Sequence, residues 1–171
     1  MGYTAQFTLS EAPCLLNHKN DRIEKHGEED VLACDLSISY ETSNDILAMF
    51  APALKSSLYM RSDSAQGSLV PDQEHLTALR FPALCEKPLK WADGDLIGAE
   101  VKFHHGISSK SDVAFQPTKV TKFKLECLEG GTVVVHFLVQ VNPTDAQTSF
   151  LSKVLRDKVC TISVTPLAAE S

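Results

Sequence analysis

The chain has 171 residues, a length that suits one domain or two very small ones. With 43 % hydrophobic and 22 % charged residues, it predicts a folded chain with a core of its own and excludes a disordered one. Its 22 acids against 16 Lys and Arg give a net charge of −6, which argues against a dedicated duplex-DNA binder. No apolar run is long enough to span a membrane and the start lacks the order of a secretory signal, so we expect no membrane partner.

The acidic excess lies in the first half of the sequence. Residues 1–85 hold 12 acids and 6 bases, a net of −6, whereas residues 86–171 hold 10 of each, a net of zero. The first half contains the run Glu28-Glu29-Asp30 beside a glycine turn. This run is either a solvated hairpin tip or an acidic patch that binds a basic surface of a partner.

The cysteines predict free thiols in a reducing compartment. Five occur, an odd number, and no two stand in a CxxC pair. Their spacings do not fit a zinc site, and several fall in alternating apolar runs, where cysteine behaves as a small hydrophobe. We therefore expect no metal and no cofactor.

The first half predicts two strands followed by helical structure. Residues 31–41 alternate with even positions inward, and residues 5–16 should supply the partner strand across the turn at Gly27. Ser43 is a good N-cap for a helix over 44–59, which Pro52 should kink or divide in two. Residues 61–75 are polar and rich in turn formers, which predicts a mobile loop.

The second half predicts three further strands, a hairpin and a helix. The expected elements are strands at 99–105 and 112–116, the latter closed by Pro117, a hairpin of 119–127 and 132–141, a helix at 143–157 capped by Asn142, and a last strand at 158–165.

Both halves therefore contain a ββα order. We predict a single α+β domain over 1–171, with pseudo-repeat units at about 5–60 and 118–165 and a central segment at 61–117. The expected fold is a mainly antiparallel sheet of six to eight strands carrying two helices, with a partly closed barrel as the alternative.

No enzyme motif stands out. The sequence lacks GxGxxG, GxSxG, HExxH and EF-hand patterns. His104 and His105 are adjacent on a strand, so they face opposite sides and cannot easily share a metal. His136 is interpreted as a buried, hydrogen-bonded histidine. These features predict a protein that is not an enzyme.

A basic strand offers a different interpretation. Lys119, Lys122 and Lys124 lie along one expected strand, and Trp91 could supply a stacking surface. Lysines beside aromatic rings are typical of single-stranded nucleic-acid binders. The same pattern also fits an ordinary half-buried strand with a solvated face.

Three stretches resemble an uncharacterised family of small proteins encoded by proteobacterial prophages and temperate phages. They are EKHGEEDVLACDLSI, LRFPALCEKPLKW and FKLECLEGGTVVVHFLVQVNPTDAQTSFLSKVLRDKVCTISV. The resemblance implies a protein made in the cytoplasm of a bacterial host, and it carries over no site residues.

Two functions follow as hypotheses. The leading one is a phage accessory protein that binds and inhibits or redirects a host protein, such as a defence protein, through Glu28, Glu29 and Asp30. The alternative is a single-stranded DNA-binding protein of phage recombination or replication that uses Lys119, Lys122, Lys124 and Trp91. A homodimer is compatible with either hypothesis.

Overall fold

The computed structural model describes residues 6–62 and 75–168. Most of the loop expected over 61–75 lies outside these residues. The elements are β1 (Leu9–His26), β2 (Glu29–Ser43), α1 (Leu54–Leu58), β3 (Tyr59–Arg61), β4 (Leu76–Leu79), β5 (Leu89–Trp91), β6 (Leu96–His104), β7 (Val113–Cys127), β8 (Thr132–Val141), α2 (Asp145–Asp157) and β9 (Val159–Thr165).

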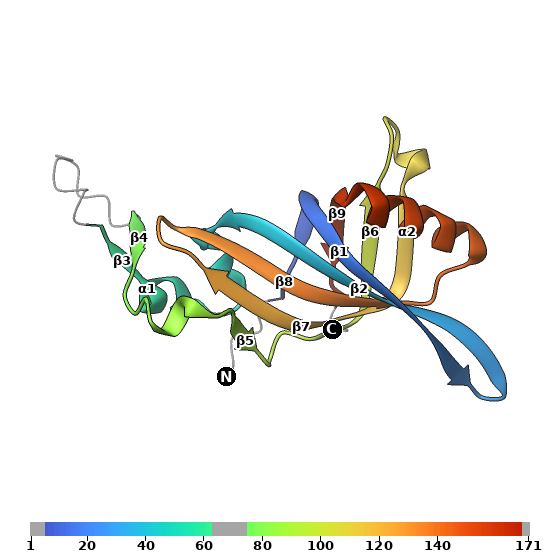
Figure 1. The fold of residues 1–171 in the computed structure, drawn as a ribbon, viewed down its shortest axis with the longest axis horizontal. Coiled ribbons are helices and arrows are strands. Elements are labelled where there is room, and N and C mark those ends of the chain that lie inside the picture. The colour runs from blue at the N-terminus through green and yellow to red at the C-terminus, as the bar shows by residue number, and fades with distance from the viewer. Residues whose placement is uncertain (1–5, 63–74, 169–171) are drawn as a thin grey trace.

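Six of the described strands close into a barrel (Figure 1). Its order is β7-β6-β9-β1-β2-β8, and β8 returns to pair with β7; every neighbouring pair is antiparallel. The short β5 extends the sheet beside β7, and β3 and β4 form a separate two-stranded sheet. The predicted mainly antiparallel α+β sheet is confirmed. The structure has a closed barrel, whereas the alternative offered by the sequence was a partly closed one.

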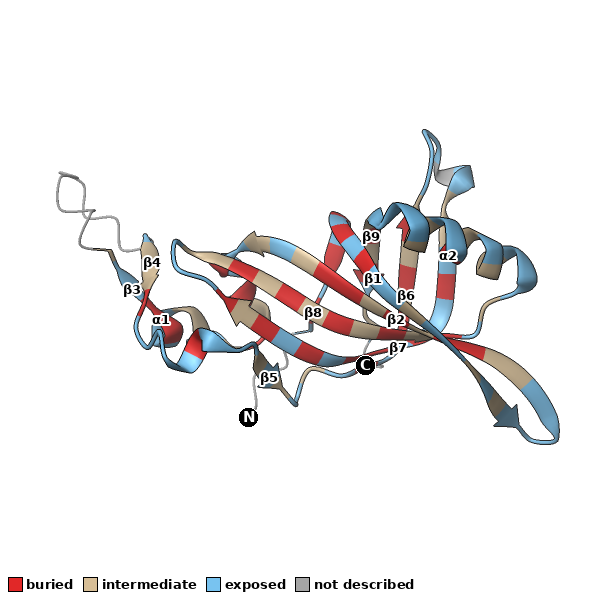
Figure 2. Cartoon of the chain, viewed as in Figure 1, coloured by how far each residue is buried: buried red, intermediate tan, exposed pale blue. Residues whose placement is uncertain are grey.

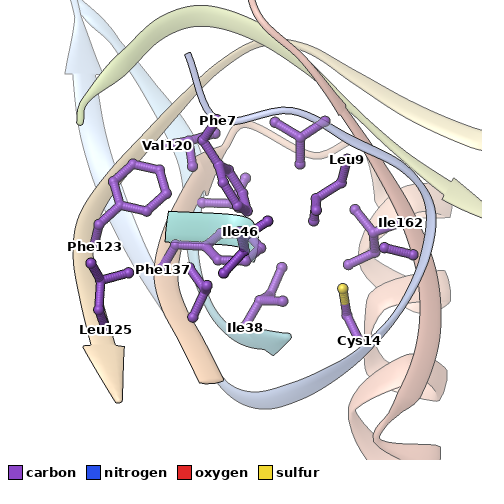
Figure 3. Close-up of a cluster of buried hydrophobic side chains, with 14 of the residues drawn as sticks. Phe7, Leu9, Cys14, Ile38, Ile46, Val120, Phe123, Leu125, Phe137 and Ile162 are labelled. Carbon is purple, nitrogen blue, oxygen red and sulfur yellow. The ribbon is translucent and has the colours of Figure 1, made fainter. Parts of the chain in front are cut away.

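The barrel interior is filled by the inward side chains of alternating strands. In β8, Val133, Val135, Phe137, Val139 and Val141 are all buried, as predicted, while the residues between them are half-buried (Figure 2). Figure 3 shows side chains from distant segments, Phe7, Ile38, Phe123 and Ile162 among them, converging on one cluster. A closed barrel needs this period of two in every strand, because one face of each strand lines the interior.

Helix α2 covers one end of the barrel. Leu151 is fully buried, and the ring of Phe150 meets that of Phe103 edge-on at 5.8 Å. The expected cap at Asn142 is wrong: the N-cap is Thr144, which forms a capping box with Gln147. The Thr144 side chain accepts from the amide of Gln147, and the Gln147 side chain accepts from the amide of Thr144, so the box satisfies two free amides. Asn142 lies too far before the helix to do the same.

The first helical segment is divided, as Pro52 predicted. A 3₁₀ helix spans Asn44–Met49, and α1 follows at Leu54–Leu58. Ser43 is the N-cap of the 3₁₀ helix and accepts a hydrogen bond from the amide of Asp45. These pieces are much shorter than α2, so the equivalence of the two ββα units stays a prediction. Among the described residues, no helix combines the length and hydropathy that crossing a membrane requires.

Strand β7 does not end at Pro117, contrary to expectation. Its pairing with β6 passes from Val101–Phe115 to Ala99–Thr118, so β7 carries an extra residue there. The Gln116–Pro117 peptide bond is cis. Proline lacks an amide proton for the ladder, and a bulge is a position within a sheet that tolerates it.

Candidate functional site

A groove of about 390 Å³ crosses the outer face of the barrel over β1, β2, β7 and β8. We call it the basic groove. It is lined by Asn17, His18, Ser37, Ile38, Pro88, Lys122, Lys124, His136, Phe137 and Leu138. Two of the lysines singled out from the sequence therefore belong to one concave surface.

Strand register explains why basic side chains gather here. Lys124 of β7 lies opposite Lys90 of β5 on one side and opposite His136 of β8 on the other. His136 in turn lies opposite Ser39 of β2. Directly opposite residues in antiparallel strands point to the same face, so these four side chains form one row across the outer face.

A β-bulge turns Lys122 and Lys124 outward. Between Thr121–Leu138 and Lys124–His136, β7 has two residues where β8 has one, and Lys122 takes a left-handed φ of 56°. An extra residue shifts the in–out alternation by one. Val120 before the bulge and Phe123 within it both face the core, which leaves Lys122 and Lys124 exposed.

The groove carries uncompensated positive charge. Its lining within the described chain contains no carboxylate, and no ion pair there engages Lys90, Lys122 or Lys124. Glu126 lies beside the groove, with its Oε2 2.9 Å from Nε2 of His136. His136 is hydrogen-bonded, as expected, but it is half-buried on the outer face. Such a surface attracts anions, phosphate groups in particular.

The remaining predicted basic and aromatic residues lie elsewhere. Lys119 is exposed on β7 between Ile97 and Gln140 and does not line the basic groove. Trp91 lies opposite Phe123, and its ring meets that of Phe50 edge-on at 6.0 Å. Trp91 therefore packs toward the core, on the face of β5 opposite to the one that carries Lys90.

The acidic run lies at the end of a projecting hairpin (Figure 1). The first strand is much longer than expected, so residues 22–26 of β1 and 29–33 of β2 pair with each other beyond the barrel wall. We call residues 22–33 the arm. Asp30 at its tip pairs with Lys25 at 2.7 Å, whereas no ion pair within the described chain holds Glu28 or Glu29.

Ion pairs continue from the arm into the strands at its base. Arg22 contacts Glu24 and lies 3.0 Å from Asp35, and Lys19 lies 2.7 Å from Asp21. The buried thiol of Cys34 donates to Asp21 at 2.8 Å, and this hydrogen bond is the largest cause of the lowered pKa of that carboxyl. Charged pairs on strand edges discourage indiscriminate pairing with other sheets.

All five cysteines are free. Burial raises the pKa of Cys14 and Cys34 to about 12 and that of Cys127 and Cys160 to about 11. In the part of the chain that is described, no group of three or more His, Cys, Asp and Glu side chains could hold a metal ion. Four of the five thiols are buried in the core, as the alternating apolar runs that contain Cys34 and Cys127 predicted for those two.

His18 lines the basic groove and was not singled out from the sequence, whereas His136, which was interpreted as buried, lines it too. Lys90 lies beside the groove, opposite Lys124, through strand pairing between residues far apart along the chain. The sequence signal for Lys90 was its alternation with Leu89 and Trp91. That signal places Lys90 on a polar face without identifying the neighbouring strand.

Comparisons with protein-family models, with curated proteins and with solved structures find no match to this chain. The resemblance to phage-encoded proteins therefore stays a prediction.

Proposed function

We propose that the protein binds single-stranded nucleic acid in the basic groove. The observation that carries the proposal is the row formed by Lys90, Lys124 and His136, with Lys122 turned to the same face by the bulge. Positively charged grooves that follow a phosphate backbone are the common element of single-strand binders. This proposal takes up the single-stranded DNA-binding hypothesis from the sequence. It keeps Lys122 and Lys124, and it replaces Lys119 and Trp91 with Lys90, His18 and His136.

The net charge of −6 does not oppose this function, because no carboxylate of the described residues lines the groove, and Glu126 beside it is engaged with His136. Unpaired acids lie at the tip of the arm, whereas the lining of the groove within the described residues lacks carboxylates. Small five-stranded barrels of the OB type bind oligonucleotides on the outer face of two adjacent strands. The β7–β8 face of this six-stranded barrel offers a comparable surface, which is an analogy of arrangement only.

The packing of Trp91 argues for weak sequence preference. The aromatic rings that flank the groove face the core, so contacts with phosphates dominate over base stacking. Binding that depends on phosphates falls steeply with salt, by a slope of about 0.7 per neutralised phosphate for single strands.

A titration tests this function. Fluorescence anisotropy of a labelled oligothymidine is measured against the protein at several salt concentrations. Lys122→Glu combined with Lys124→Glu is expected to weaken binding by about tenfold or more and to lower the salt slope by about 1 to 2. Lys110→Glu combined with Lys153→Glu makes the same change of charge at exposed positions outside the groove and is expected to leave binding nearly unchanged. Absence of binding by the wild type at low salt contradicts the proposal.

The arm favours a second candidate, the binding of a host protein. Ile23 is 66 % exposed on the arm, and Glu28 and Glu29 extend beyond it without an ion pair in the described chain. Acids without an ion pair at the tip of a projecting hairpin offer a negative surface that complements a basic one. In this candidate role the partner offers a basic surface with an apolar centre.

Charge reversal tests the arm. The complex between the wild type and a candidate partner is first reconstituted from the two purified proteins. Glu28→Lys combined with Glu29→Lys is then expected to abolish this complex. Glu86→Lys combined with Asp93→Lys, two exposed acids outside the arm, is the matched control. A complex of unchanged affinity in the arm variant would remove the arm from the interface.

A further inference from the structure

A polar network on the opposite side of the barrel has the geometry of an activated serine. Nε2 of His104 lies 2.6 Å from Oγ of Ser163, and Nδ1 of His104 lies 3.2 Å from Oδ2 of Asp112. His104 ends β6, Ser163 lies in β9, and Asp112 directly precedes β7. Three segments of the chain thus bring Asp, His and Ser together in the order of a catalytic triad.

The network lies on the outer face of the sheet. Phe103, Ile162 and Val164 are buried, so the alternating His104 and Ser163 point outward. The side chains of His104 and Asp112 are only 21 % and 13 % exposed, and Ser163 is half-buried. The site is therefore partly shielded from water and still accessible from solvent.

The hydrogen bonds favour one tautomer of His104. A carboxylate can only accept, so Nδ1 carries the proton that faces Asp112. Nε2 then accepts from the Ser163 hydroxyl. In this state the imidazole can take the serine proton, and Asp112 holds the ring in place and stabilises the imidazolium.

The backbone of a strained residue adds a fourth group to the network of Asp112, His104 and Ser163. Glu11 has a left-handed φ of 46°, and its amide donates to Oγ of Ser163 at 2.9 Å. It lies in a β-bulge, where β1 has two residues between Leu9–Val164 and Ala12–Ile162 while β9 has only Ser163. This amide donates to Oγ itself, so it stabilises the negative charge that develops on the serine oxygen as its proton leaves. Strained backbone in a non-glycine residue is enriched at functional sites.

We propose that Ser163 is a nucleophile toward activated acyl esters, with His104 as its general base and Asp112 as a positioning residue. The Ser163 Oγ–C bond forms as the bond from the acyl carbon to the leaving oxygen breaks. The serine proton passes to Nε2 of His104 and from there to the leaving alkoxide or phenolate. Water, deprotonated by the same imidazole, then releases the carboxylic acid and restores Ser163. The step needs no oxidant or reductant.

Covalent labelling tests the assignment. The intact protein is treated with a fluorophosphonate, and in parallel with p-nitrophenyl acetate, and the adducts are located by mass spectrometry. One adduct on Ser163 is expected, together with release of p-nitrophenolate. Ser163→Ala is expected to abolish both, whereas Ser152→Ala on α2 should label like the wild type.

Variants of the two partners separate catalysis from structure. His104→Ala is expected to slow labelling by about 100-fold, and added imidazole should restore part of the rate. Asp112→Asn should slow labelling and change its pH profile, because an amide cannot stabilise the imidazolium. His104→Gln replaces the alanine variant if circular dichroism shows that the latter does not fold.

The competing explanation is structural: Ser163 only provides a hydrogen-bond acceptor for the backbone amide of Glu11 in the bulge. It predicts that Ser163→Ala lowers the melting temperature while the wild type acquires no adduct on Ser163. That outcome overturns the proposal, as does an adduct that forms equally fast in the wild type and the His104 variant.

Discussion

Lys90 lies directly opposite Lys124 in the β5–β7 pairing, and both side chains are exposed on the same face of the sheet. Like charges at such positions destabilise a sheet, typically by a few tenths of a kcal/mol up to about 1 kcal/mol. A polyanion in the basic groove would relieve this repulsion. The pair therefore links the stability of the free protein to the function we propose.

Lys90→Glu is expected to have opposite effects on stability and binding. A cross-strand ion pair with Lys124 replaces a repulsion, which should add about 0.5–1 kcal/mol to the free energy of unfolding. The same change removes positive charge beside the groove and should weaken oligonucleotide binding several-fold. Thermal melting and anisotropy titration measure the two effects, and Lys90→Gln should give intermediate values. A variant that loses both stability and binding would show that Lys90 has another structural role.

The buried thiols predict alkaline destabilisation. Burial raises the pKa of Cys14 and Cys34 to about 12 and that of Cys127 and Cys160 to about 11, from an ordinary value of 9.0. The folded state then keeps protons that the unfolded state releases, so this stability is complete below pH 9 and is lost as the pH rises toward 11 to 12. With four thiols the slope approaches about 5 kcal/mol per pH unit at pH 10.

Urea unfolding at pH 8 and pH 10, with a reducing agent present, measures this loss. Cys160→Ala removes one titrating thiol and should reduce the slope at pH 10 by about 1.1 kcal/mol per pH unit. Equal unfolding midpoints at the two pH values would be incompatible with thiols that stay protonated in the folded state.

Gly94 packs against two aromatic rings and should not tolerate a methyl group. A Cβ built there would lie 2.9 Å from Cδ2 of Phe123 and 3.2 Å from Cδ1 of Trp91. Gly94→Ala is therefore expected to lower the free energy of unfolding by about 1–3 kcal/mol through overpacking. In a Phe123→Leu background the additional loss should be smaller, because the ring atom that clashes is gone. Additive losses in chemical denaturation would contradict this explanation.

The cap of α2 can be assigned by a pair of alanine variants. Thr144→Ala removes the side chain that accepts from the amide of Gln147 and should lower the free energy of unfolding by about 1 kcal/mol. Asn142→Ala removes only an exposed hydrogen bond to the carbonyl of Leu32 and should have less effect. If Asn142→Ala is the more damaging change, the cap lies where the sequence first placed it.

The alternating strands and the free thiols could be predicted because they depend on local patterns. The inward positions of 132–141, the cap at Ser43 and the division at Pro52 all followed from spacing within one segment. The extra length of β1 could not be predicted. Its outer half, in the arm, pairs with β2 alone and has no apolar alternation, so it lacks the signal of a half-buried strand.

The candidate sites depend on pairing between distant segments. Lys90 meets Lys124, and His104 meets Ser163, only because particular strands become neighbours in particular registers. Bulges set the side-chain direction of Lys122 and the placement of Glu11, and a bulge changes the alternation without leaving a motif in the sequence. Sequence patterns could therefore identify Lys122 and Lys124 as exposed without showing what they face.

The closure of the barrel between β1 and β9 also determines when the chain can fold. Cys14 and Cys160 are partners across that seam, 146 residues apart. A ribosome must therefore make the chain through β9 before the first strand finds one of its two neighbours. Such non-local pairing slows folding and leaves strand edges exposed to other chains in the meantime. A chain that ends before β9 would leave both β1 and β6 with an open edge, and we expect it to aggregate.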